Sequence, residues 1–166
     1  MTPGQIGYSA YAVSTGGKTF DGRHMPRWED LPDRIQAAWE AAGIAILMRD
    51  SDLRDRKNRV QNILWATADL LERKGFHAGS CAVDADNRVV DPHSDQADRF
   101  CVSGAARAVA FRGVDGEGSP EEADYLAAMD VFCKSVGTAT VMEWADVPGR
   151  TTREAVEALK YAARRP

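Results

Sequence analysis

The stretch RVQNILWATADLLERKG, residues 59–75, decides the fold that this sequence predicts. Its apolar side chains recur every three or four residues, a spacing that places them on one face of an α-helix. They are Val60, Ile63, Leu64, Thr67, Leu70 and Leu71. Gly75 after two cationic residues is typical of a helix C-terminus. Ser51 or Asp52 can cap the other end, so we expect one amphipathic helix between these signals.

Two shorter helices are predicted toward the N-terminus. The first lies within residues 5–17, where two tyrosines share a face and a Gly-Gly pair ends the helix. The second runs from Pro32, which suits a first helical position, to Ala42. Its apolar stripe is Leu31, Ile35, Trp39 and Ala42. Gly43 ends or weakens this helix, and the run IAILM, residues 44–48, is compatible with either strand or helix.

A hairpin and a further helix are predicted after Gly75. The segments SCAV, residues 80–83, and RVVD, residues 88–91, flank a turn-rich centre at residues 84–87, which indicates two short paired strands. Ser94 is the expected cap of the next helix. We place that helix at the centre of the core because small residues on its face let a neighbouring helix approach closely. The residues of the face are Ala97, Phe100, Cys101, Gly104, Ala105 and Ala108.

Two start signals predict the C-terminal helices. Ser119, followed by Pro120 and two glutamates, marks the first of them, and Gly137 marks its end. The apolar stripe of this helix is Leu126, Met129, Cys133 and Val136. Thr151 and Glu154 form a capping box for the last helix. The face of that helix is Val156, Leu159 and Ala163.

The segments between these helices complete the predicted fold. TATVMEW, residues 138–144, is rich in β-branched residues and predicts a short strand. GVDGEG, residues 113–118, predicts a flexible connection. Together the elements predict an α+β fold that is mainly helical, with five or six helices and a small β-hairpin or sheet. We expect an N-terminal helical segment, residues 1–50, and a core helical domain with the hairpin, residues 51–166, that form one compact unit.

Composition bounds the function. The chain has 166 residues and a formal net charge of -4, without a basic surface pattern, so we expect no direct sequence-specific binding of nucleic acid. We expect no membrane span and no signal peptide, because the apolar runs are too short. Three widely spaced cysteines do not suggest a disulfide framework, which favours a reducing compartment. The sequence therefore predicts a cytoplasmic protein.

The loop Asp-Val-Pro-Gly-Arg-Thr, residues 146–151, is the leading candidate binding site. The guanidinium of Arg150 and the helix N-terminus beside it are suited to an anion such as phosphate or carboxylate. The structural alternative, which we favour, is that Asp146 and Thr151 satisfy donors at the helix start and that Arg150 holds the loop in place.

Two tryptophans beside loops, Trp28 and Trp144, are expected to be partly exposed, whereas the two tryptophans inside predicted helices are expected in the core. An exposed indole near Arg27 or Arg150 predicts a surface for stacking a nucleotide or docking a protein. The candidate binding residues are therefore Trp144, Asp146, Arg150, Thr151, Trp28 and Arg27.

The patterns for catalysis are weak, so we favour a protein that is not an enzyme. The enzymatic alternative is a small hydrolase of nucleotides or phosphoesters, and its candidate residues are His77, His93, Asp91 and Arg150. Nucleophilic catalysis would need a serine or cysteine beside a histidine; Ser80 and Cys81 lie near His77 in the sequence, but no local signature of such catalysis occurs.

Metal and cofactor signatures are also weak. Four residues have the side chains of zinc ligands, but their spacings match no zinc signature: His77, Cys81, His93 and Cys101. An acidic run lacks the glycine and the terminal glutamate of an EF-hand, which favours a hairpin turn: Asp84, Asp86, Asp91 and Asp95. No P-loop or Rossmann pattern occurs. We therefore expect no metal and no cofactor.

Four segments resemble a family of uncharacterised bacterial and phage proteins. They are LLERKGFHAG (70–79), AVDADNRVVDP (82–92), ADRFCVSGAARAV (97–109) and EWADVPGRTTREAVEAL (143–159). That family shows a Trp-Asn-Asp-x-Pro-Gly-Arg-Thr loop, and here Ala145 stands in place of its Asn, so a role of that side chain does not carry over. The pattern Trp-x-x-Leu then Gln-x-x-Trp, residues 28–39, resembles short actinobacterial and phage segments.

The resemblance implies an accessory protein of a phage or mobile element. Such proteins often block host machinery, so we expect a non-catalytic binding protein that inhibits a host defence system in the host cell cytoplasm. Its partner would be a host protein complex, as for anti-CRISPR proteins, or a small nucleotide signal, as for sponge proteins. A third alternative is a homo-oligomeric structural module, whose mark would be a large apolar face.

Overall fold

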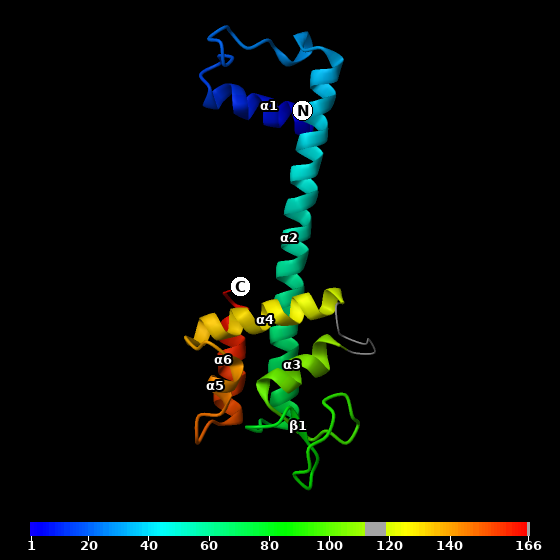
Figure 1. The fold of residues 1–166 in the computed structure, drawn as a ribbon, viewed down its shortest axis with the longest axis vertical. Coiled ribbons are helices and arrows are strands. Elements are labelled where there is room, and N and C mark those ends of the chain that lie inside the picture. The colour runs from blue at the N-terminus through cyan, green and yellow to red at the C-terminus, as the bar shows by residue number, and fades with distance from the viewer. Residues whose placement is uncertain (112–118, 166) are drawn as a thin grey trace. The chain divides into compact units, whose positions relative to one another are not determined.

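The computed structural model describes residues 1–111 and 119–165. In this part of the chain the fold is mainly helical, with six α-helices and one two-stranded antiparallel sheet (Figure 1). The helices are α1 (Pro3–Ser14), α2 (Asp33–Lys74), α3 (Val102–Ala110), α4 (Pro120–Val136), α5 (Val141–Ala145) and α6 (Thr152–Ala163). A short 3-10 helix is η1 (Trp28–Asp30), and the sheet pairs β1 (Ala82–Val83) with β2 (Arg99–Phe100). The predicted fold class is confirmed.

The chain divides into two compact units, residues 1–55 and residues 56–166. We call them the N-terminal unit and the C-terminal unit. The first part of α2 belongs to one and its last part to the other. The predicted connection GVDGEG, residues 113–118, lies outside the described residues.

In the N-terminal unit, α1 packs closely on α2 through two glycines. A Cβ added to Gly4 would lie 2.6 Å from the backbone nitrogen of Glu40, and one added to Gly43 would lie 2.7 Å from the carbonyl carbon of Pro3. The prediction that Gly43 ends a helix is therefore wrong. This glycine serves the helix crossing, and α2 continues through the IAILM run and past Ser51, which is not a cap.

An aromatic cluster forms the small core of this unit. Tyr8 is buried, with its ring centroid 5.8 Å from that of Trp28 and 5.5 Å from that of Trp39. Its hydroxyl donates a hydrogen bond of 2.8 Å to the carbonyl oxygen of Pro26. The buried residues of the N-terminal unit are Gly4, Tyr8 and Leu31.

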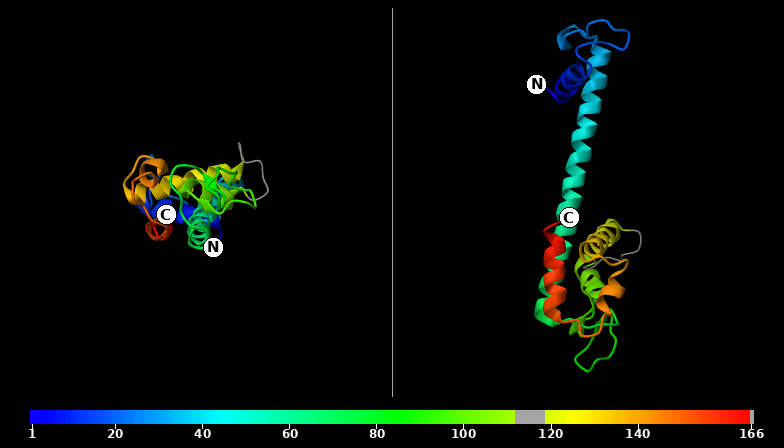
Figure 2. Two further views of the ribbon diagram at one scale, coloured as in Figure 1. Left: turned by 90° about the horizontal axis from the view of Figure 1, so that it is seen from below. Right: turned by 90° about the vertical axis from the view of Figure 1, so that its left-hand side faces the viewer.

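The core of the C-terminal unit lies between the end of α2 and helices α3, α4 and α6. Helix α6 runs beside the end of α2 (Figure 2), where the side-chain amide of Gln61 donates to the carbonyl oxygen of Ala163 at 3.0 Å. The largest side chains that are fully buried are Phe132, Leu64, Leu71 and Leu159. The face predicted for residues 59–75 and the face predicted for the last helix are thus in the core, as Val60, Leu159 and Ala163 show.

The helix expected to begin at Ser94 begins instead at Val102. The Ser94 hydroxyl accepts from the backbone N–H of Gln96 in a local turn, whereas the sulfur of Cys101 accepts from the backbone N–H of Gly104 and caps α3. Phe100 is buried as expected, although it reaches the core from β2 and not from a helix.

The segment TATVMEW does not form the predicted strand: Thr140 caps α5, and the four residues after it belong to that helix. The Thr140 hydroxyl accepts from the backbone N–H of Glu143, and the Glu143 carboxylate accepts from the backbone N–H of Thr140. This capping box satisfies donors that a helix start leaves open, and it therefore favours a helix over an isolated strand. On α4, Leu126 is 57% exposed, contrary to the predicted stripe, and Phe132 takes the buried position.

Candidate functional site

The loop between α5 and α6 surrounds a buried tryptophan. Trp144 is only 7% exposed, so the prediction that its indole is partly exposed is wrong. Its ring meets that of Phe132 edge-on, with 5.2 Å between centroids. The guanidinium carbon of Arg150 lies 4.0 Å from the centre of the indole. The indole is therefore packed between protein groups and leaves little room for a stacked base.

Arg150 makes the contacts that are expected if its role is to hold the loop in place. Its Nε donates to the carbonyl oxygen of Trp144 at 3.2 Å, and its Nη1 lies 3.7 Å from a carboxylate oxygen of Glu154. Asp146 is exposed and follows the last residue of α5, so it does not cap α6 as predicted. The guanidinium of Arg150 is thus held by the indole and the carbonyl oxygen of Trp144 and by the carboxylate of Glu154.

Thr151 begins α6 through a capping box. Its hydroxyl accepts from the backbone N–H of Glu154 at 3.2 Å, while its own backbone N–H and hydroxyl donate to the Glu154 carboxylate at 2.8 and 2.9 Å. These hydrogen bonds favour the ionised acid and lower the pKa of Glu154 below its ordinary value of 4.5.

We expect Glu154→Gln to weaken the pH dependence of stability in acid. Because the folded state lowers the pKa of Glu154, its contribution is present above the unfolded pKa and is lost as pH falls through the folded pKa. The melting temperature of the variant should therefore fall less than that of the parent between about pH 6 and pH 3. Glu157→Gln is the control, because Glu157 pairs with Arg153 at 3.0 Å and not with the helix start. Equal curves for both variants would contradict the assignment.

The two other candidate binding residues lie in the N-terminal unit. Arg27 is exposed and precedes η1, and Trp28 is half-buried with its ring edge-on to Tyr8. The six candidates from the sequence are therefore divided between the two compact units. The exposed guanidinium of Arg27 next to a partly open indole remains a candidate contact.

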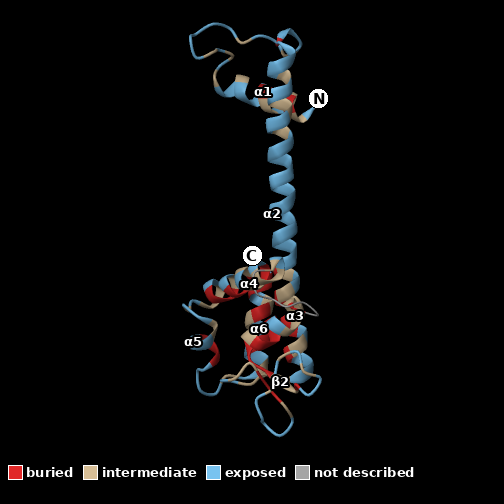
Figure 3. Ribbon diagram, turned by 45° about the vertical axis from the view of Figure 1, so that its right-hand side comes forward, coloured by how far each residue is buried: buried red, intermediate tan, exposed pale blue. Residues whose placement is uncertain are grey.

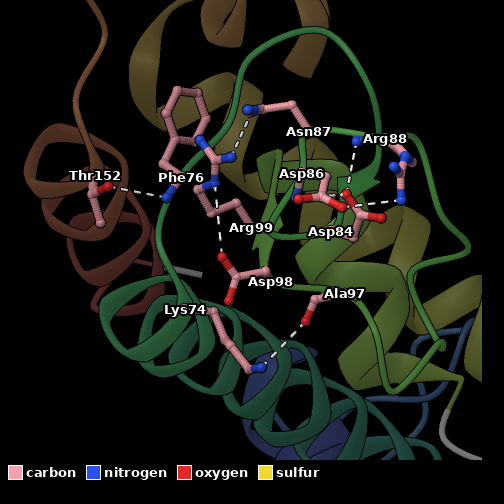
Figure 4. A network of polar contacts seen from close by, with 10 residues as sticks. All are labelled: Lys74, Phe76, Asp84, Asp86, Asn87, Arg88, Ala97, Asp98, Arg99 and Thr152. Carbon is pink, nitrogen blue, oxygen red and sulfur yellow. Dashed lines mark hydrogen bonds and ion pairs between the residues drawn. The ribbon is translucent and has the colours of Figure 1, made fainter.

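The acidic run forms the hairpin turn that the sequence predicts (Figure 4). The Asp84 carboxylate accepts from the backbone N–H groups of Asp86 and Arg88 at 2.9 and 2.8 Å. Asn87 adopts a left-handed conformation with φ of 66°. The sequence predicts that residues 80–83 pair with residues 88–91. In the structure β1 pairs with β2, and the predicted partner segment contributes one isolated bridge, between Val83 and Val89.

Arg99 links the hairpin tip to the sheet. Its Nη2 donates to the side-chain oxygen of Asn87 at 2.5 Å, and its Nε lies 4.0 Å from the carboxylate of Asp98 (Figure 4). On the other side of this region, the Thr152 hydroxyl accepts from the backbone N–H of Phe76 at 3.0 Å, which ties the segment after α2 to the start of α6.

The two candidate catalytic histidines make hydrogen bonds through their backbone N–H groups. The backbone N–H of His77 donates to the Phe100 carbonyl at 2.8 Å, and that of His93 donates to the Asp91 carboxylate at 2.7 Å. A pocket of about 420 Å³ is lined by His93 and Lys74, but His77 and Asp91 are not part of its lining.

The described residues contain no group of three His, Cys, Asp or Glu side chains that could hold a metal ion. Cys101 is buried, and this burial raises the pKa of its thiol to about 11, so the sulfur is a neutral thiol at physiological pH. The hydroxyl oxygen of Ser80 is buried and has no hydrogen-bond partner in the part of the chain that the structure describes. No base therefore activates Ser80 as a nucleophile.

The sequence reasoning missed an apolar groove in the N-terminal unit. It encloses about 290 Å³ and is lined by Met1, Pro3, Ile6, Gly7, Gly43, Ile46 and Leu47. We call it the apolar groove. Ile6, Ile46 and Leu47 are 55%, 68% and 56% exposed, and Met1 is open as well. Leu53, which is 58% exposed, follows Ile46 two helical turns along the same face of α2, in a stretch that Figure 3 colours as exposed.

None of the helices in the described residues combines the length and apolar character that a membrane span requires.

Fold and surface define a mainly helical C-terminal unit, preceded in the chain by a small helical unit with an open apolar groove. The chain belongs to a family of unknown function, DUF6197, whose model matches residues 55–165. No curated protein and no solved structure matches the chain. The family match begins at the residue where the N-terminal unit ends, so the apolar groove lies outside the part that defines the family.

Proposed function

We propose that the protein is a non-catalytic binding protein that assembles with a second copy of itself through the apolar groove. The observation that supports this proposal is the exposure of Ile6, Ile46 and Leu47 around one groove, with Leu53 on the adjoining turns of α2. Large contiguous apolar patches that stay open to water are uncommon on monomeric proteins, and they often mark interaction surfaces.

The N-terminal unit has a small core, so association of two copies would add substantially to its buried apolar surface. Gly4, Tyr8 and Leu31 are its buried residues, and it contains no cysteine that could crosslink it. Domains with so little core usually depend on disulfides, metals or oligomerisation. Covering a half-open aliphatic side chain contributes about 1 kcal/mol. The four side chains Ile6, Ile46, Leu47 and Leu53 in each of two copies therefore contribute on the order of 8 kcal/mol, which is within the range of the association cost of about 4–15 kcal/mol.

The charges beside the groove suit a second copy. A two-fold interface places one patch against the same patch of the partner, so a surface with a single sign of charge would repel itself. Arg49 and Asp52 are both exposed on the turns between Ile46 and Leu53. An arginine of one copy can therefore face an aspartate of the other.

We expect Ile46→Asp to convert a dimer into a monomer. The carboxylate would be desolvated in the interface, which should raise the dissociation constant at least about 100-fold. The measurement is the molar mass by light scattering after gel filtration at about 10–100 µM protein, against a chain mass of 18.1 kDa. The helix content by circular dichroism should be unchanged in the dissociated variant.

Leu126→Asp is the matched control, because Leu126 is an exposed apolar residue of α4, outside the apolar groove. This variant should remain a dimer. A parent protein that stays monomeric throughout the concentration range would contradict the proposal, as would an Ile46→Asp variant that dimerises like the parent.

The narrower form of the proposal is an accessory protein of a phage or mobile element that inhibits a host defence system. The resemblance to bacterial and phage proteins supports it, and the C-terminal unit would bind the host protein complex or nucleotide signal. Plaque formation on a defended host tests it: expression of the chain should restore phage growth, and unchanged resistance would contradict it. For the hydrolase alternative, His77 and Asp91 are not in the lining of the pocket that contains His93, although the Asp91 carboxylate accepts from the backbone N–H of His93 at 2.7 Å.

A further inference from the structure

Two cysteines lie opposite each other at the end of the small sheet. The antiparallel register pairs Ala82 with Phe100 and Val83 with Arg99, and its continuation pairs Cys81 with Cys101. The backbone N–H of Cys101 donates to the carbonyl oxygen of Cys81 at 3.1 Å. Directly opposed residues of antiparallel strands have Cα atoms about 4.5–5.5 Å apart, which is inside the range of about 4.4–6.8 Å found for disulfides.

The backbone around this pair is closely packed. A Cβ on Gly104 would lie 1.8 Å from the carbonyl oxygen of Cys81, so the first turn of α3 rests directly on the residue before β1. The sulfur of Cys101 also accepts from the backbone N–H of Gly104 at 3.2 Å. Both cysteines are thus fixed in relation to each other by hydrogen bonds and by close packing.

The two thiols differ in access to solvent. Both are free; Cys81 is half-buried and Cys101 is buried. Burial raises the pKa of the Cys101 thiol to about 11, and the nearby Cys81 thiol adds to this rise. Cys81 is therefore the sulfur that a dissolved oxidant reaches first, and Cys101 is placed to resolve the product.

We propose that Cys81 and Cys101 form a redox-responsive pair that a small disulfide such as oxidised glutathione converts into an intramolecular disulfide. In the first step the thiolate of Cys81 attacks one sulfur of the oxidant, which releases one glutathione thiolate and leaves a mixed disulfide. In the second step Cys101 loses its proton to solvent and attacks the sulfur of Cys81, which releases the second glutathione. Two protein thiols lose two electrons, and one glutathione disulfide becomes two thiols.

The bond would close the loop that carries the hairpin and would change the cap of α3. The sulfur of Cys101, which now accepts from the backbone N–H of Gly104, would become part of the crosslink, and the crosslink would restrict the unfolded chain. The pair lies entirely in the C-terminal unit, so this inference is independent of the proposed assembly through the apolar groove.

The test is the incubation of the full chain with oxidised glutathione, followed by intact mass measurement and thiol titration after unfolding. The parent should lose about 2 Da without a retained adduct. Its titratable thiols should fall from three to one, which is Cys133. Cys133→Ser should still form the bond, because Cys133 lies on α4 and is outside the pair.

Cys101→Ser distinguishes the proposed order of events, and serine can keep the helix cap. This variant should retain one glutathione on Cys81, and Cys81→Ser should form neither the adduct on that residue nor the crosslink. A parent protein that stops at the mixed disulfide, or that keeps three free thiols while Cys81 is accessible to an alkylating reagent, would overturn the proposal.

Discussion

Gly104→Ala is expected to lower the free energy of unfolding of the C-terminal unit by roughly 3 kcal/mol, because the added methyl group has no space. Its carbon would lie 1.8 Å from the carbonyl oxygen and 2.5 Å from the carbonyl carbon of Cys81. Both atoms belong to backbone that is hydrogen-bonded to Cys101, so α3 would have to move away from the sheet. Urea unfolding followed by circular dichroism measures the loss.

Gly7→Ala is the matched control for this substitution. Gly7 also lies inside a helix, α1, but a Cβ there would meet the ring of Trp39 at an ordinary 3.6 Å. Alanine has the better helix propensity, so we expect this variant to be stabilised by about 0.5–1 kcal/mol. A Gly104→Ala protein that unfolds at the same urea concentration as the parent would show that α3 does not rest on Cys81 as described.

Trp144→Ala should cost about 3–5 kcal/mol of stability, the range found for large buried aromatic residues. The substitution removes a ring that packs edge-on against Phe132 and lies under the guanidinium of Arg150. It also leaves a cavity between α4 and the loop before α6. The measurement is the midpoint of urea unfolding at constant slope.

Met142→Ala provides the comparison for Trp144, because Met142 belongs to the same helix α5 and is 65% exposed. Its effect should stay within about 0.5 kcal/mol. If instead Trp144→Ala retained full stability, the indole would be a surface residue and the candidate stacking site of the sequence analysis would regain support.

Helix starts were predictable where a capping pattern was present and the neighbouring residues did not favour a strand. Ser119 and the Thr151–Glu154 pair cap helices as expected. The pair Thr140 and Glu143 has the same spacing, but its β-branched neighbours favour a strand when they are considered alone. A helix forms there because of the hydrogen bonds of the capping box and because the residues that follow become buried. That burial depends on the tertiary fold and is not visible in the local sequence.

Features that depend on contacts between distant residues could not be predicted. Gly43 is a plausible helix end by itself, and only the approach of Pro3 explains why it lies inside α2. The apolar residues Ile46 and Leu53 recur at a spacing that is visible in the sequence, but no local rule shows whether another element covers them. The candidate loop was recognisable, whereas the position of Arg150 over Trp144 follows from the turn between them.

Helix α6 has a consequence for how the C-terminal unit forms during synthesis. Its buried residues pack against α4. Two side-chain hydrogen bonds connect it to α2, one from Gln61 of α2 and one from Lys160 of α6. The Thr152 hydroxyl also accepts a hydrogen bond from the backbone N–H of Phe76. A nascent chain that has emerged only to residue 151 therefore exposes a hydrophobic cleft that its own earlier helices cannot fill. Helices α2, α3 and α4 are synthesised earlier, but the native core is complete only after α6 has been synthesised and has packed against them.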